Sequence, residues 1–272
     1  MKKNRMLALM CTAILSCFLT ISCSQTTDNS SSEPTTSPVN LTVSAAASLK
    51  DAMEEIKPIY EQQNPNISLT LNLASSGSLR QQIEQGAPVD LFISASPYHI
   101  NMLQKKGLIV EETSRDLLKN QMVLIVPTEN TAAVKTFQDL TKDTIKNISI
   151  GEPESVPAGK YGKEVLTYLG IYETLEPKIV FAKNVRQVLN YVATGNVDAG
   201  IVYRTDTNAS DAVKIVANAP DNSHTPVIYP IAVIKDSKNI EAAKKLEDFM
   251  FTSEAKAVFE KYGFITVFKS RN

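Results

Sequence analysis

The chain has 272 residues, with 28 lysines and arginines against 29 aspartates and glutamates, so its formal net charge is −1. This balance gives no basic face of the kind that nucleic acids require, and we expect no nucleic-acid partner. The cysteines, Cys11, Cys17 and Cys23, all lie near the N-terminus. This position excludes disulfide scaffolds, zinc–thiolate sites and cysteine nucleophiles from the rest of the chain.

Residues 1–22 have the composition of a signal peptide. A short basic start is followed by an apolar run that ends near residue 19 and is short for a membrane span. The small residue before Cys23 resembles the lipobox of bacterial lipoproteins, which implies cleavage before Cys23 and lipidation of its thiol. Cleavage before Cys17 and an ordinary secretory signal are the alternatives. We expect an extracytoplasmic protein held at the cell membrane by a lipid anchor on Cys23.

Residues 23–39 are rich in serine, threonine and proline, which predicts a disordered tether. Loss of residues 1–22 removes three basic residues and leaves 25 against 29 acidic ones, so the mature chain has a net charge of −4. An anionic ligand must therefore be held by local groups, not by the field of the whole protein. The absence of tryptophan disfavours stacking on sugar rings.

Strand-like and helical segments alternate along the body of the chain. Strands are predicted at residues 41–47, 67–73, 90–95, 121–127, 148–151, 179–182, 199–203, 213–217 and 227–234. Helices are predicted at residues 49–60, 78–85, 97–106, 161–169, 185–193 and 240–262. Pro58 is expected to kink or shorten the first helix, and Asn184 to cap the helix at 185–193. Strands separated by such helices indicate parallel pairing with right-handed crossovers.

Two series of these units indicate two α/β lobes, joined by strand-like runs near Gln121 and Val227. We expect a first lobe built from residues 40–122 and 230–272, and a second lobe built from residues 123–229. Ligands of such folds lie at the carboxyl ends of the strands, where helices begin. The cleft between the lobes is therefore the expected binding site.

Small and hydroxyl residues occupy the expected strand-to-helix junctions. Ser48 and Ser76 follow the first two strands, and Ala158 and Val185 lie near the starts of two later helices. Unpaired N–H groups and the positive end of the helix dipole can hold an anion there without any charged side chain. Tyr203 adds a phenolic hydroxyl at the end of a strand.

The ordered set of these segments resembles the molybdate-binding proteins of ABC transporters, which are type II periplasmic solute-binding proteins. Its landmarks are AAASL at 45–49, ASSGSLRQQIEQGAPVDLFISAS at 74–96, GEPESVPAGKYGKE at 151–164, NVRQVL at 184–189, GIVYRTD at 200–206 and YPIAV at 229–233. The resemblance implies a two-lobed α/β fold with mixed, mostly parallel sheets and a two-strand hinge. It also implies an oxyanion held by the hydroxyls of Ser48, Ser76 and Tyr203. Backbone N–H groups at the two serines, Ala158 and Val185 complete the implied ligand set.

The function implied by the resemblance is that of a receptor. It would bind molybdate and also tungstate, with molybdenum present only as the bound oxyanion, and deliver it to the membrane permease of an ABC transporter. Neither catalysis nor a cofactor is expected, and the receptor would be a monomer. Gly77 stands where many members have a third serine, and Ser96 where aspartate is common. Gly77 leaves open a shift in affinity or in the preferred anion.

The chemistry of a tetrahedral dianion agrees with uncharged donors. Such an ion has only acceptor atoms, so hydroxyl and N–H groups suit it and a carboxylate would repel it. Receptors for sulfate or phosphate use the same donors and are the main alternative, although phosphate usually calls for an acceptor to meet its proton. An organic-acid or sugar receptor is less favoured. A hydrolase is disfavoured because the chain has no HExxH, GxSxG or phosphate-binding glycine loop.

Each candidate residue also has an ordinary structural interpretation. Ser48 and Ser76 could be simple helix caps, and Tyr203 a half-buried core residue. Arg186 is expected to be solvated or paired with a surface acid, and His99 to lie on the surface. Only the joint pattern favours a binding site over these interpretations.

Overall fold

The computed structural model describes residues 38–129 and 133–268. The predicted signal peptide, Cys23 and nearly all of the predicted tether lie outside these residues. Within the two described ranges, no helix has both the length and the apolar character that a membrane span requires.

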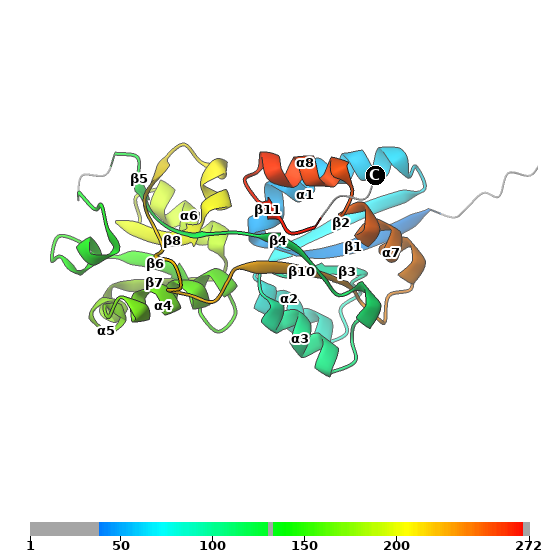
Figure 1. Ribbon diagram of the computed structural model, residues 1–272, viewed down its shortest axis with the longest axis horizontal. Coiled ribbons are helices and arrows are strands. Elements are labelled where there is room, and N and C mark those ends of the chain that lie inside the picture. The colour runs from blue at the N-terminus through cyan, green and yellow to red at the C-terminus, as the bar shows by residue number, and fades with distance from the viewer. Residues whose placement is uncertain (1–37, 130–132, 269–272) are drawn as a thin grey trace, which may run out of the picture. The chain divides into compact units, whose positions relative to one another are not determined.

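The first lobe is built on a six-stranded sheet with helices on both faces. In spatial order the strands are β11 (Ile265–Thr266), β4 (Arg115–Lys119), β10 (Ile228–Val233), β3 (Leu91–Ile93), β1 (Val39–Ala46) and β2 (Ile67–Ala74). Its helices are α1 (Lys50–Gln63), α2 (Ser76–Glu84), α3 (Pro97–Lys105), α7 (Ile240–Phe249) and α8 (Ser253–Lys261). Figure 1 shows α1 and α8 on one face of this sheet and α2 and α3 on the other.

The second lobe is built on a five-stranded sheet. In spatial order its strands are β7 (Ile179–Ala182), β6 (Ile148–Gly151), β8 (Ala199–Tyr203), β5 (Met122–Pro127) and β9 (Val213–Asn218). Its helices are α4 (Pro157–Tyr168), α5 (Tyr172–Leu175) and α6 (Val185–Ala193), with α4 and α6 on opposite faces (Figure 1). Each lobe thus packs apolar helix faces on a central sheet, which confirms the predicted two-lobed α/β fold.

The chain crosses between the lobes twice, from β4 to β5 and from β9 to β10 (Figure 1). The two crossings are hydrogen-bonded to each other. The N–H of Asn120 donates to the carbonyl of Val227 at 3.2 Å, and the N–H of Ala219 donates to that of Met122 at 2.9 Å. They form the hinge of two neighbouring strands that the resemblance implied. The limits of the lobes, residues 40–122, 123–229 and 230–272, stay predictions.

Both sheets are mixed, with less parallel pairing than predicted. Strand β1 pairs in parallel with β2 and β3, and β6 with β7 and β8, as helical crossovers require. The other pairings are antiparallel: β10 with β3 and β4, β11 with β4, and β5 with β8 and β9. Most of the antiparallel pairs involve β4, β5, β9 and β10, the strands on either side of the two crossings. Among the described residues, no helix lies within either crossing, and the chain leaves the first lobe through β4 and returns to it through β10 in the opposite direction.

Several element predictions were wrong in detail. Helix α1 continues past Pro58 to Gln63, so the proline does not shorten it. Helix α4 begins at Pro157, four residues earlier than expected, because proline is well suited to the first helical position. The predicted C-terminal helix is divided at Thr252, whose side chain accepts a hydrogen bond from the N–H of Ala255 and starts α8.

His99 is buried, contrary to the expected surface position. It lies in α3 with 4% of its surface exposed. Burial is the main cause that lowers the pKa of His99, from 6.5 to about 4. The nearby charges of Arg80 and Lys160 lower it further, and Glu84 opposes them. The folded protein therefore holds this imidazole neutral.

The pH dependence of stability should report on His99. As the pH falls from 6.5 to about 4, His99 becomes protonated in the unfolded chain but stays neutral in the folded protein. The free energy of unfolding therefore decreases over this range, by about 3 kcal/mol. Urea titration at pH 7 and at pH 4.5 measures the change in unfolding free energy between the two pH values. His99→Phe should lack the part of this change that comes from His99. The opposite contribution of Asp206, whose pKa burial raises to about 6, is common to both proteins and cancels. Equal pH slopes would contradict a neutral His99.

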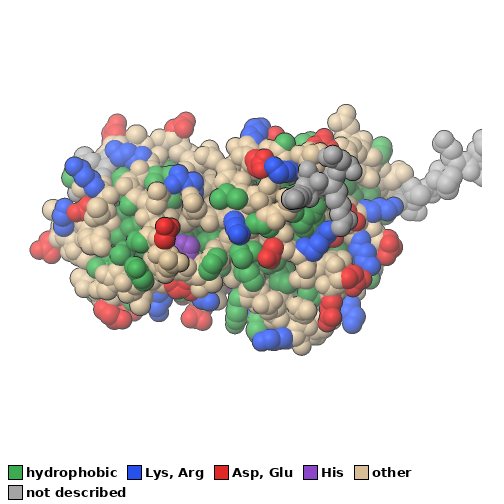
Figure 2. Space-filling view, in the orientation of Figure 1, with side chains coloured by type: hydrophobic (Ala, Val, Ile, Leu, Met, Phe, Trp, Pro, Cys, Tyr) green, Lys and Arg blue, Asp and Glu red, His purple; other side chains and the backbone are tan. Residues whose placement is uncertain are grey.

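Acidic and basic side chains are interspersed over the face of the molecule shown in Figure 2. No broad area of one sign covers this face. The distribution on this face agrees with the balanced composition of the chain.

Candidate functional site

A small cavity lies where helices of both lobes begin. Its walls include the short 3-10 helix η1 (Ala47–Leu49), the first turns of α2, α4 and α6, and the end of β8. The predicted site residues all line it: Ser48, Ser76, Ala158, Val185 and Tyr203. Each has 4% or less of its surface exposed. The fold therefore brings these five residues together at the carboxyl ends of the strands, where ligands of α/β proteins bind.

Ser76 does not cap its helix, so that ordinary interpretation was wrong. The cap of α2 is Ser75, whose side chain accepts a hydrogen bond from the N–H of Ser78. The Oγ of Ser76 instead accepts from the N–H of Ala95 at 2.9 Å. Because a hydroxyl carries one donor hydrogen besides its acceptor sites, the Ser76 proton remains available to a guest in the cavity.

Ser48 is also free of a capping role. It lies inside η1, where the caps of η1 and α1 are Ala46 and Leu49. Its Oγ lies 2.9 Å from the hydroxyl oxygen of Tyr229. This contact joins a strand that follows the second crossing to the wall of the cavity.

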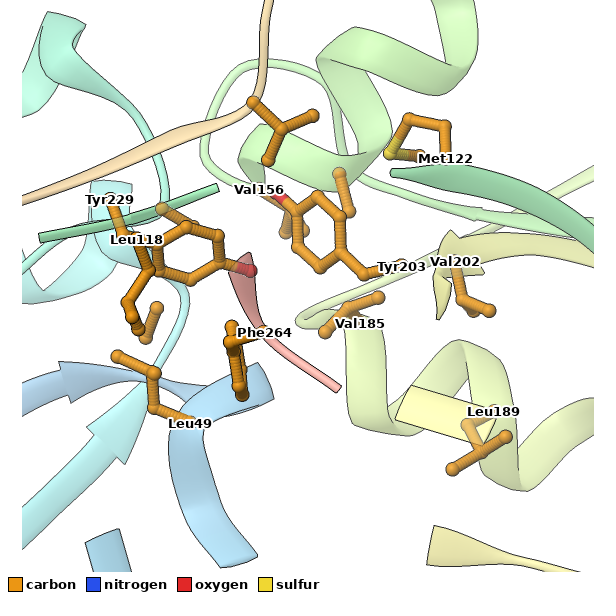
Figure 3. Packing of buried hydrophobic residues seen from close by; sticks show 14 of the residues in the cluster. Leu49, Leu118, Met122, Val156, Val185, Leu189, Val202, Tyr203, Tyr229 and Phe264 are labelled. Atoms are coloured by element: carbon orange, nitrogen blue, oxygen red, sulfur yellow. The ribbon is translucent and has the colours of Figure 1, made fainter. Parts of the chain in front are cut away.

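Tyr203 presents a buried hydroxyl that lacks a partner. Its ring is 1% exposed, and its oxygen makes no hydrogen bond with any residue in the described ranges. Burial, with the neighbouring Tyr229, raises the pKa of Tyr203 well above its ordinary value, so the hydroxyl keeps its proton. Figure 3 shows the two tyrosine rings close together among residues of both lobes. An unpaired buried donor is costly, and an acceptor bound in the cavity would satisfy it.

Ala158 and Val185 line the cavity at the first turns of two helices. Ala158 is the second residue of α4, inside the helix and not before it as expected, and Val185 is the first residue of α6. N–H groups in the first turn have no carbonyl partner within their helix. Asn184 caps α6 as predicted, since its side chain accepts from the N–H of Gln187 at 2.9 Å. Two helix dipoles of the second lobe thus point toward the cavity.

No charged side chain lines the cavity in the part of the chain that the structure describes. Arg186, the nearest candidate in sequence, is engaged elsewhere. Its guanidinium lies 2.5 Å from Asp51 of the first lobe and its Nε lies 3.0 Å from Asp206. The expected pairing with a surface acid is met by Asp51, whose side chain is 30% exposed. The second partner differs from the expectation, because the side chain of Asp206 is fully buried and that of Arg186 is only 15% exposed.

The two lobes touch directly around the cavity. Besides Arg186 and Asp51, the N–H of Gly77 in α2 donates to the carbonyl of Ser155 at 2.9 Å. Arg186 also donates to the carbonyl of Ser48 at 3.3 Å. The two lobes are therefore in contact at the edge of the cavity, and their separation would expose its walls.

The cavity is small. It contains about 210 Å³ of empty space, some of which is open to solvent. Pockets for organic ligands are typically about 300–1,000 Å³. The arrangement therefore suits one compact guest that accepts hydrogen bonds from every side, and it does not suit a sugar or an organic acid.

Comparison with known proteins places the chain in a family. A family model described as "Bacterial extracellular solute-binding protein" matches residues 41–265. The chain belongs to this family. It is 45% identical over 253 residues to "Putative ABC transporter substrate-binding lipoprotein YvgL" of Bacillus subtilis, covering 93% of this chain and 95% of the relative. It is 38% identical over 228 residues to "Molybdate-binding protein ModA" of Escherichia coli, covering 82% and 88% of the two chains.

Solved structures agree with this assignment. The "substrate binding domain of putative molybdenum ABC transporter from Clostridium difficile" is 47% identical with a TM-score of 0.65, covering 85% of this chain and 100% of that one. The periplasmic molybdate-binding protein of Azotobacter vinelandii shares the fold, with a TM-score of 0.75 at 23% identity, covering 83% and 98% of the two chains. The resemblance to type II solute-binding proteins of the molybdate-binding kind is confirmed.

Sequence reasoning missed residues that lie behind the wall of the cavity. Tyr229 was noted only as part of the YPIAV segment, and neither Asn120 nor the buried Asp206 was singled out. The Ser48–Tyr229 contact joins residues 181 positions apart. No local pattern signals such a pair, because it arises only when the second crossing returns the chain to the first lobe.

Proposed function

We propose that this solute-binding protein is a non-enzymatic, extracytoplasmic receptor that binds molybdate, and tungstate as well, and delivers it to the permease of an ABC transporter. The names of its relatives in Bacillus subtilis and Escherichia coli support the transporter and the ligand. The lipid anchor on Cys23 rests on the lipobox-like segment and on the lipoprotein name of the former relative. The monomeric state rests on the resemblance.

The observation that carries the proposal is the character of the cavity wall. Ser48 and Ser76 from the first lobe, and Ala158, Val185 and Tyr203 from the second, offer only uncharged donors. A buried dianion costs several kcal/mol unless fixed dipoles replace its hydration, and this wall supplies them from both lobes. Without a lysine or arginine in contact, no very strong ion pair has to be broken when the ion is released.

Closure of the lobes couples binding to transport in this proposal. The ion meets donors of both lobes only when they are together, so its binding shifts the protein toward the closed state. A permease that recognises the closed arrangement can then distinguish loaded from empty receptor.

Isothermal titration calorimetry of the purified protein, which measures the Kd for each anion, tests the proposal. Molybdate and tungstate should bind more tightly than sulfate and phosphate, each titrated separately at the same pH and ionic strength. A preference for sulfate or phosphate would replace the proposed ligand with another oxyanion. Absence of binding by all of the anions would overturn the proposed function.

Removal of one hydroxyl should weaken binding without unfolding the protein. Ser48→Ala and Ser76→Ala are each expected to lower the binding free energy for molybdate by about 1–3 kcal/mol, because one acceptor of the buried ion loses its donor. Ser68→Ala, which removes an exposed hydroxyl of β2 in the same lobe, outside the cavity wall, is the matched control and should bind like the wild type. Unchanged affinity in both cavity variants would refute the assignment of these serines.

A further inference from the structure

A buried chain of side-chain hydrogen bonds runs from the hinge to the cavity. Asn120 lies on the first crossing, between β4 and β5, and its Nδ2 is 3.4 Å from the hydroxyl of Tyr229. The Tyr229 hydroxyl is in turn 2.9 Å from the Oγ of Ser48, which lines the cavity. The exposed fractions of Asn120, Tyr229 and Ser48 are 8%, 0% and 2%.

The direction of this chain is fixed at its hinge end. The backbone N–H of Gln121 can only donate, and it lies 2.8 Å from the Oδ1 of Asn120. The amide group of Asn120 must therefore turn its NH₂ toward the other side, where it donates to the Oγ1 of Thr205 at 2.8 Å and to Tyr229. An amide nitrogen has no acceptor site, so the Tyr229 oxygen is the acceptor in that contact.

The hydroxyl of Tyr229 is a donor that Ser48 can accept from. Burial is the main cause that raises the pKa of Tyr229 far above its ordinary value, so the hydroxyl stays protonated. Its ring makes an edge contact with Phe264 and a tilted contact with Tyr203, at centroid distances of 5.6 Å and 5.8 Å, and Figure 3 shows the three rings. With its oxygen accepting from Asn120, Tyr229 still has its single hydrogen to donate, and the Oγ of Ser48 lies within reach at 2.9 Å.

We propose that Tyr229, oriented by Asn120, donates its hydrogen to Ser48 and is a positioning residue that holds the Ser48 hydroxyl as a donor to the cavity. This inference rests on the proposed function. Ser48 accepts from Tyr229, so its own hydrogen turns to the guest. A site whose hydroxyls can only donate favours an oxyanion without a proton and disfavours one whose O–H needs an acceptor. The hinge therefore contributes to the choice between molybdate and hydrogen phosphate.

The test is a double-mutant cycle between Tyr229 and Ser48, measured by titration with molybdate, tungstate, sulfate and phosphate. Tyr229→Phe keeps the ring and should weaken molybdate binding about tenfold, with a smaller loss for phosphate. In the Ser48→Ala background, Tyr229→Phe should weaken molybdate binding less than about twofold, because the Ser48 hydroxyl through which Tyr229 acts is already absent. Tyr60→Phe removes another buried hydroxyl of the first lobe and should leave every affinity unchanged.

The outcomes separate this inference from the proposed function. If Tyr229→Phe costs the same in both backgrounds, Tyr229 does not act through Ser48 and the inference fails while molybdate binding by the wild type stands. If the wild type prefers sulfate, the cycle is evaluated with sulfate, and coupling there supports the positioning role without the proposed ligand. If the wild type binds none of the anions, both proposals are overturned. Equal losses for molybdate and phosphate would overturn the role in selectivity.

Discussion

Arg186→Met should lower the free energy of unfolding by about 3–5 kcal/mol. The change leaves the carboxylate of Asp206 without its cation in a fully buried position. Burial already raises the pKa of Asp206 to about 6 although Arg186 lowers it, so loss of the arginine should raise it further. Urea unfolding at pH 7.5, compared with the wild type, measures the loss.

The pH dependence of this variant identifies the cause. The pKa of the Asp206 carboxyl in the folded state lies above its unfolded value of 3.8. The free energy of unfolding therefore rises as the pH falls, because the folded state takes up the proton first. The deficit of Arg186→Met should therefore shrink between pH 7.5 and pH 5. In Arg186→Met combined with Asp206→Asn most of the stability should return, since no buried charge is left. A deficit that is independent of pH would show that packing, not charge, is responsible.

Asp51→Asn separates the interlobe contact from the buried pair. The Asp51 side chain is 30% exposed and pairs with Arg186 from the other lobe. Its loss should change the unfolding free energy by about 0–1 kcal/mol, as for most partly solvated pairs. Arg186 keeps Asp206, so the large effect predicted for Arg186→Met should not occur.

The local part of the fold was predictable from the sequence. Strands β6, β7 and β8 and helix α6 have the expected bounds, because short apolar runs and a capping Asn184 define them locally. Strand β4 was missed because its sequence, RDLLK, carries charges at both ends and only a short apolar centre. Its pairing with β10 depends on a segment more than a hundred residues away.

The candidate site likewise has a part that was predictable from local sequence and a part that depends on tertiary contacts. Ser48, Ser76, Ala158 and Val185 were predictable as strand-to-helix junctions, since helix starts carry their own chemistry. The Arg186–Asp206 pair and the Tyr229–Ser48 hydrogen bond are tertiary contacts that local sequence does not signal. The sequence also left the meaning of Gly77 open. Its amide contacts the other lobe at Ser155, a relation that no local pattern contains.

Gly77→Ala should weaken ligand binding while leaving the empty protein stable. A Cβ at this position would lie 2.5 Å from the carbonyl oxygen of Ser155 and 2.7 Å from its Cα, so the lobes could not come together as they do here. Separation of the lobes relieves the clash, and alanine within α2 is intrinsically favourable by about 0.5–1 kcal/mol. We expect at least about a tenfold weaker Kd for molybdate, measured by titration, and an unchanged or slightly raised Tm without ligand.

Gly159→Ala is the matched control because its clash lies within one lobe. A Cβ there would meet the carbonyl oxygen of Gly151, which belongs to the same sheet-and-helix unit. Opening of the lobes cannot relieve this contact, so the empty protein itself should lose about 1–3 kcal/mol or more. Thermal unfolding with and without molybdate distinguishes the two glycines. If Gly77→Ala lowered the Tm of the empty protein as Gly159→Ala should, the empty protein would not open at the Gly77–Ser155 contact, and Gly77 would serve stability, not closure.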